Sequence, residues 1–212
     1  MRISLLASVV GILFAFPLAY WIGRRFSPRL RAVVVGSFVT LMFLSILVRT
    51  YALELTFGAA GLLRPILLSF GISPNGRNYI EFLVGAGLLH YIVPMATLTL
   101  LGTIQNVDPR LVDAAQALGA PAWKAHLTIT VPLCRRGLLA AFLFAFTFSI
   151  SAFVIPMILG KGRVLFISNI IYNRFSEIAD YPSGAAISIV LFGFALIIVY
   201  VLSRQVHGRW TQ

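Results

Sequence analysis

Acidic side chains are the groups in this sequence most able to do chemistry, and there are only six of them. No two form a paired acid–base constellation. Four fall between hydrophobic stretches, where they either attract a cationic solute or simply balance neighbouring arginines. These four are Glu54, Glu81, Glu177 and Asp180.

Metal and phosphate chemistry find equally little support. The single cysteine, Cys134, excludes an intramolecular disulfide framework and a cysteine-rich metal site. The three histidines are far apart and share no ligand spacing. The run Gly160-Lys161-Gly162 lacks the hydroxyl residue of a nucleotide-binding loop. We therefore expect no catalytic residue, no metal and no cofactor, and no ATP hydrolysis by this chain itself.

The composition requires a solvent other than water. Hydrophobic residues make up 59% and charged residues 11%, against about 25% charged in a soluble domain. The net charge of +11 could suit a nucleic acid. Here, however, the charges lie between apolar segments, so membrane topology explains them better and no nucleic-acid partner is expected.

Five stretches are long and apolar enough to cross a bilayer as helices. The first could be a signal peptide, but four arginines follow it and it is long for that role, so we interpret it as a retained helix. Arg49 is expected to reach the interface from the second. The sequence predicts an all-α membrane protein, one transmembrane domain over 1–212, with spans at about 3–22, 32–53, 82–101, 137–159 and 183–203.

The basic residues predict the orientation of these spans. The segments 23–31, 102–136 and the C-terminal tail would share one side of a five-span protein and hold ten of the seventeen basic residues, Arg204 and Arg209 included. The other side holds seven basic residues and four of the six acids. By the positive-inside rule the first side is cytoplasmic, the N-terminus is outside and the C-terminus inside.

Short apolar runs in the outer loops predict partial insertion. The runs 65–72 and 164–172 are too short to span, so each is a re-entrant or an interfacial piece. Pro17, Pro94 and Pro156 are expected to interrupt and kink three spans.

The inner segment 102–136 has the signals of two short helices joined by a glycine. Asp108 is a good N-cap with Pro109 in the first helical position. Gly119 is placed to end the first helix in a left-handed conformation. Pro121 can start a second helix, which Pro132 is expected to stop.

The spacing within this elbow is specific. It resembles the EAA loop of bacterial ABC importer permeases. The matching pattern is Asp113-Ala114-Ala115, three residues, Gly119, nine residues, Ile129, one residue and Val131-Pro132. Asp113 and Val131 replace the Glu and Leu of the family pattern. The likeness extends over nearly the whole chain and is greatest to the spermidine/putrescine-type permeases, through the segments Val48-Arg49-Thr50-Tyr51-Ala52, Gly61-Leu62-Leu63, Tyr91-Ile92-Val93-Pro94-Met95 and 162–175.

The resemblance implies the core of a type I ABC importer permease in the bacterial cytoplasmic (inner) membrane. It implies as partners two copies of an ATP-binding subunit, a second permease that is homologous or identical, a periplasmic or extracellular solute-binding protein, and membrane lipid. Family members usually have six spans, so either a first span is missing here or the subunit uses a five-span core. The implied ATPase-coupling residues are Asp113, Ala114, Ala115, Gly119, Trp123, Ile129 and Pro132.

The resemblance also implies a small solute, a polyamine or an amino-acid-like or opine-like compound. The candidate substrate-pathway residues are Tyr51, Glu54, Glu81, Tyr91, Glu177 and Asp180. The alternative is a stand-alone secondary transporter or channel, which usually needs ionisable residues inside its spans and often internal repeats. The span centres here are nearly free of charge. A membrane enzyme or a structural anchor is a third alternative.

Overall fold

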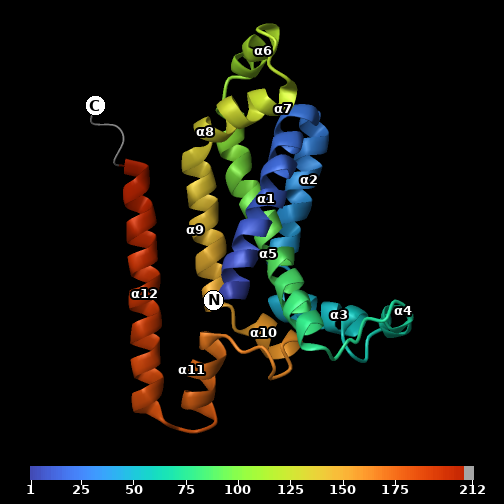
Figure 1. The fold of residues 1–212 in the computed structure, drawn as a ribbon, viewed down its shortest axis with the longest axis vertical. Coiled ribbons are helices and arrows are strands. Elements are labelled where there is room, and N and C mark those ends of the chain that lie inside the picture. The colour runs from blue at the N-terminus through green and yellow to red at the C-terminus, as the bar shows by residue number, and fades with distance from the viewer. Residues whose placement is uncertain (208–212) are drawn as a thin grey trace.

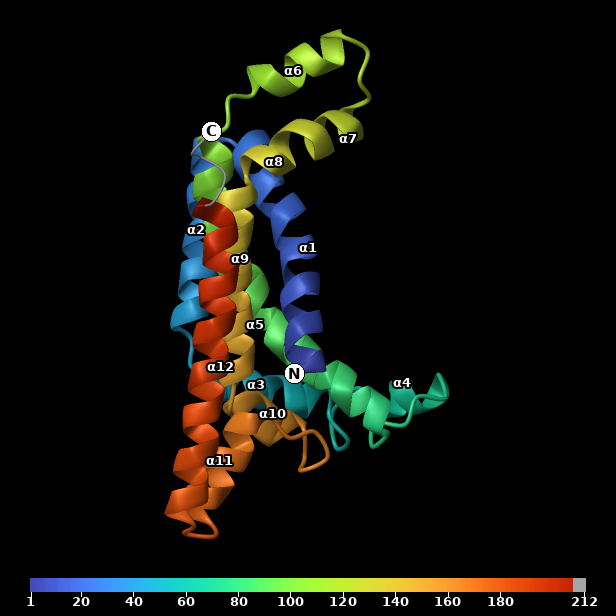
Figure 2. The same ribbon diagram turned by 60° about the vertical axis from the view of Figure 1, so that its left-hand side comes forward.

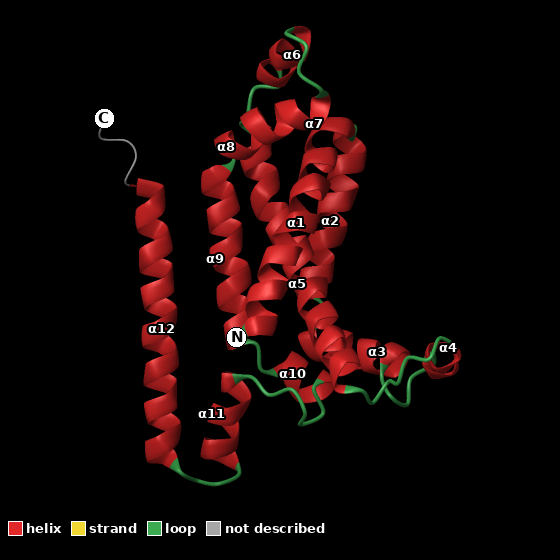
Figure 3. Cartoon of the chain, viewed as in Figure 1, coloured by secondary structure: helices red, strands yellow, loops and turns green. Residues whose placement is uncertain are grey.

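The computed structural model describes residues 1–207, and every regular element in that part of the chain is a helix (Figure 3). Three helices form the core (Figure 1): α1 (Arg2–Arg25), α5 (Arg77–Gln105) and α9 (Arg135–Ser151). The all-α prediction is confirmed.

Small residues along α1 allow this close packing. Ser4, Ser8, Gly11, Ala15 and Ala19 recur every three or four residues and face inward. A Cβ added to Gly11 would lie 2.5 Å from Ile92 Cγ2 on α5, so only glycine fits there. Small residues at helix crossings are the usual means of tight packing in membranes, where apolar burial provides little drive between helices.

Two of the five expected spans are broken. Helix α2 (Pro28–Phe43) turns by 92° into α3 (Ile46–Phe57), so the expected span at 32–53 ends at residue 43. The fourth expected span, 137–159, breaks at Ala152 and Phe153 before α10 (Val154–Leu159). Three helices, α1, α5 and α12 (Tyr181–His207), are long and apolar enough to cross a membrane, or up to five if each bent pair is one span.

Two of the three expected prolines leave their helices unbroken. Helices α1 and α5 continue through Pro17 and Pro94. The break near Pro156 lies three residues before it, and Pro156 itself is the third residue of α10. The missing N–H of Pro156 would have no intrahelical partner at that position in any case.

The elements separate into two ends (Figures 1 and 2). At one end lie the turn between α1 and α2, the elbow with α6 (Arg110–Ala117) and α7 (Ala122–Ala125), and the end of α12. At the other lie the N-terminus, α3, α4 (Arg64–Ser69), α10 and α11 (Ile167–Ser176). The segments predicted to be cytoplasmic thus share one end, although Arg209 lies outside the described residues.

Candidate functional site

The first helix of the elbow is largely unsupported by the rest of the chain. Helix α6 begins at Arg110, one residue later than predicted, and Asp108 Oδ1 accepts a hydrogen bond from the Arg110 backbone N–H at 2.9 Å. Only Val112 of α6 is buried. Asp113 and Ala114 are exposed and Ala115 is half-buried, so these predicted coupling positions are accessible on the surface of the chain.

Gly119 makes the turn between the two helices. Its φ is +90°, as predicted, in a region that disfavours any residue with a Cβ. A Cβ added there would have no atom within 4 Å. The requirement for glycine is therefore one of backbone conformation and not of space.

The second half of the elbow differs from the prediction. Helix α7 widens into a π-helical turn, His126–Thr130, and continues as α8 (Val131–Leu133). Pro132 lies inside α8, which ends one residue later at Leu133, close to where the proline was expected to stop the helix. The difference is the π turn, in which the Val131 N–H donates to the His126 carbonyl five residues earlier.

The elbow projects from one end of the bundle (Figure 2), and several of its large apolar side chains are exposed. Leu118 is 91% exposed and Trp123 67% exposed, and Leu111 and Leu127 are also exposed. Ile129 is half-buried and Pro132 exposed. An exposed apolar set of this kind is typical of a protein–protein or membrane interaction surface.

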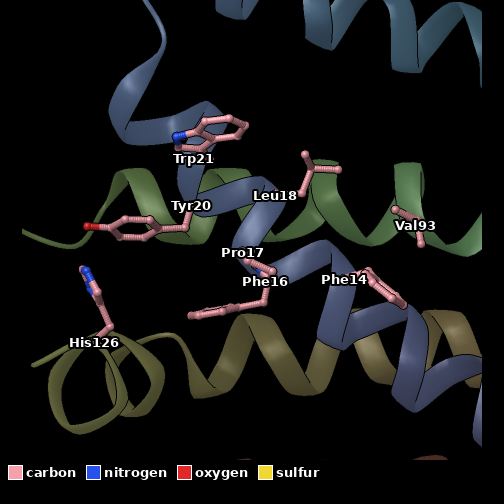
Figure 4. Close-up of a pocket in the computed structure, with 8 residues that line it drawn as sticks. All are labelled: Phe14, Phe16, Pro17, Leu18, Tyr20, Trp21, Val93 and His126. Atoms are coloured by element: carbon pink, nitrogen blue, oxygen red, sulfur yellow. The ribbon is translucent and has the colours of Figure 1, made fainter. Parts of the chain in front are cut away.

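Two contacts connect the elbow to α1. The Arg24 guanidinium donates to the carbonyls of Ile104, at 2.9 Å, and Val107, where α5 ends. The Tyr20 ring meets the His126 ring edge-on at a centroid distance of 4.6 Å. Figure 4 shows these rings beside a largely apolar cavity of about 720 Å³, lined by Phe14, Phe16, Pro17, Leu18, Tyr20, Trp21, Val93 and His126.

The four acids predicted for the substrate pathway already have partners and are not gathered into one site. Glu54 Oε1 on α3 pairs with Lys161 at 2.6 Å, while its Oε2 is buried without a hydrogen-bond partner. Glu81 on α5 pairs with Arg77 at 3.1 Å. Glu177 accepts a hydrogen bond from Asn173.

Asp180 has a structural role in the turn before α12. Hydrogen bonds from the Ser183 hydroxyl and backbone N–H hold the pKa of this carboxyl below its usual value, and Arg174, 3.4 Å away, acts in the same direction. Ser183 lies in the first turn of α12, so Asp180 caps the helix.

Tyr51 and Tyr91 have different environments. Tyr51 is exposed on α3. Tyr91 is stacked on Phe148 of α9, with ring centroids 4.1 Å apart and planes 12° apart.

Arg49 lies against Tyr91 and is the residue that the sequence placed wrongly. Its side chain is buried, 7% exposed, instead of reaching the interface. Its guanidinium carbon lies 5.0 Å from the Tyr91 ring centroid, and Nε and Nη1 are buried without a hydrogen-bond partner. A cation–π contact is worth about 0.5–2 kcal/mol, less than the several kcal/mol that burying an ion costs.

Metal ligation finds no candidate in the described part of the chain, where no group of three or more His, Cys, Asp or Glu could hold an ion. The bundle and its exposed elbow are those of a multi-pass membrane protein with an apolar surface exposed at one end. The family model described as "Binding-protein-dependent transport system inner membrane component" matches residues 11–212. The chain belongs to this family of inner-membrane importer permeases.

Relatives of this chain support the assignment. It is 27% identical over 206 residues to the spermidine/putrescine transport system permease protein PotB of Haemophilus influenzae, covering 96% of this chain and 72% of the relative. PotB of Escherichia coli K12 is 26% identical over 214 residues, with 99% and 78% covered. The molybdenum transport system permease protein ModB of Haemophilus influenzae is 29% identical over 177 residues, with 80% and 71% covered.

Solved structures share the fold. A chain of a bacterial alginate ABC transporter, in complex with an alginate-bound periplasmic protein, matches with a TM-score of 0.73 at 19% identity, covering 97% of this chain and 77% of that one. An amino acid ABC transporter with histidines matches with a TM-score of 0.54 at 16% identity, covering 96% and 89%.

Proposed function

We propose that this importer permease subunit carries a small solute inward by alternating access, driven by ATP hydrolysis on a separate subunit. The observation that carries the proposal is the projecting elbow, with Leu118 and Trp123 exposed at its tip. The elbow docks on the ATP-binding subunit. Asp113 lies at the contact, and Gly119 makes the turn between the two helices. The end that bears the elbow is cytoplasmic, so the N-terminus is outside and the C-terminus inside.

The complete importer contains two ATP-binding subunits, a second permease and a solute-binding protein. The contacts of Arg24 and Tyr20 with the elbow end support a direct route for movement, because they join α1 to α5 and to the second half of the elbow. The solute is a polyamine or an amino-acid-like or opine-like compound. Relatives named for spermidine and putrescine support an amine-bearing solute.

The test is uptake by the reconstituted complex. Proteoliposomes containing the permease pair and ATP-binding subunits, with the solute-binding protein outside, are expected to accumulate a labelled amine-bearing solute only when ATP is hydrolysed. Accumulation by this chain without ATP, driven by an ion gradient, would instead support a secondary transporter.

A further inference from the structure

Arg49 is a buried cation in unfavourable surroundings. It lies in the first turn of α3, where the helix dipole is positive and no acidic residue is present. None of the ion pairs among the described residues includes it. His90, which lies within electrostatic reach of Arg49, is a base and not an acid. An anionic group beside Arg49 would pair with the guanidinium and offset both its burial and the positive end of the helix dipole.

The place that Arg49 occupies is where helices are broken. The bend between α2 and α3 lies just before it, and α3 packs on α10, which follows the break at Ala152 and Phe153. Tyr91 and Phe148 bring α5 and α9 to the same point. Transporters commonly bind solutes where spanning helices are discontinuous, and ionisable residues at membrane depth commonly mark such pathways.

We infer that Arg49 receives the carboxylate of the transported solute when this region opens. The inference rests on the importer function proposed above and names its substrate class as a small amine-bearing acid. A guanidinium binds a carboxylate through charge-assisted N–H···O bonds, and two nitrogens of Arg49, Nε and Nη1, are buried without a hydrogen-bond partner.

Glu54 is the acidic residue of α3. It lies five residues after Arg49 on α3, about 7.5 Å further along the helix axis. Its Oε2 is buried without a partner, whereas Oε1 is held by Lys161. Five residues turn an α-helix by about 500°, so Glu54 lies about 140° around α3 from Arg49, and the inference concerns the carboxylate of the solute alone.

Matched solutes test the inference. Putrescine and 4-aminobutyrate share a four-carbon chain but differ in one end group, and ornithine is putrescine with a carboxylate added. Uptake of 4-aminobutyrate or ornithine is expected in the ATP-driven assay. Arg49→Gln should lower its rate roughly 10- to 100-fold, the range for losing a charged hydrogen-bonded contact, and Arg49→Lys less. Arg64→Gln, an exposed arginine of α4 at the same end, is the control and should leave uptake unchanged.

The thermal stability of Arg49 variants distinguishes a role in binding the solute from a structural role. Because Arg49 is buried and unpaired, Arg49→Met should raise the Tm of the purified complex while lowering uptake. A lower Tm, or loss of the co-purified second permease, would assign the carboxylate to a partner subunit and overturn the inference. The inference is also overturned if putrescine is taken up and neither acid is, or if uptake of the acids is insensitive to Arg49→Gln. In either case, ATP-driven uptake of any solute would leave the proposed importer function intact.

Discussion

Replacing Gly119 by valine tests how the elbow transmits force. The glycine has a φ of +90°, and holding a β-branched residue there costs about 1–3 kcal/mol. Little packing opposes relaxation, because only Val112 of α6 and Ala125 of α7 are buried. The strain therefore exceeds what the elbow's own contacts resist, and the turn should change conformation instead of unfolding the bundle.

The expected shift follows from that strain. At 1.4 kcal/mol per factor of ten, the native elbow geometry loses roughly 5- to 100-fold in population. Substrate-stimulated ATP hydrolysis by the purified complex should fall by a similar factor, while the amount of the chain in the membrane stays normal.

Two variants control this experiment. Gly119→Asn should retain more activity, because asparagine tolerates positive φ better than valine does. Gly36→Val makes the same change within the helix α2, where an added Cβ meets no atom within 4 Å, so it should have no effect. Full stimulated hydrolysis with normal assembly in Gly119→Val would refute the reasoning.

The remaining predictions concern topology, docking and pH. Cysteines at Ala120 and Ser176 should be labelled by an impermeant reagent from opposite sides, Ala120→Cys from the cytoplasm; labelling of it from outside in intact cells would reverse the orientation. Trp123→Ala should reduce co-purification of the ATP-binding subunit by tenfold or more, as loss of an interface hot spot does, without lowering the amount of this chain in the membrane. The lowered pKa of Asp180 means that its cap on α12 is complete above the ordinary value of about 3.9 and is lost as pH falls through the lower folded value. Hydrogen exchange at the Ser183 amide should therefore accelerate only below about pH 4, and Asp180→Ala should remove that pH dependence.

Local signals explain why the elbow could be predicted from the sequence. Asp108, Gly119 and Pro121 act through their own backbone chemistry, and the structure places a cap, a positive φ and a helix start at or beside them. Pro132 lies one residue before the end of α8, close to the predicted stop, whereas the π turn before it has no comparable local signal in the sequence.

Tertiary packing explains what the sequence left unpredicted. Neither proline nor glycine stands at Leu44 and Ser45, where the chain bends by 92°. The contacts of α3 with α10 and α5 accompany that bend, and they also bury Arg49, which in a straight second span would have reached the interface. Hydrophobicity alone reports that a segment is apolar and not whether it turns at its end.

Site-specific photocrosslinking tests the central claim most directly. A photoreactive benzoylphenylalanine in place of Leu118, which is 91% exposed at the elbow, is expected to crosslink to an ATP-binding subunit in native membranes. The same probe in place of Ile178, which is exposed in the turn between α11 and α12, should give no such product. Absence of the crosslink from Leu118, or its formation from Ile178 instead, would contradict the proposal that the elbow is the contact through which ATP hydrolysis drives transport.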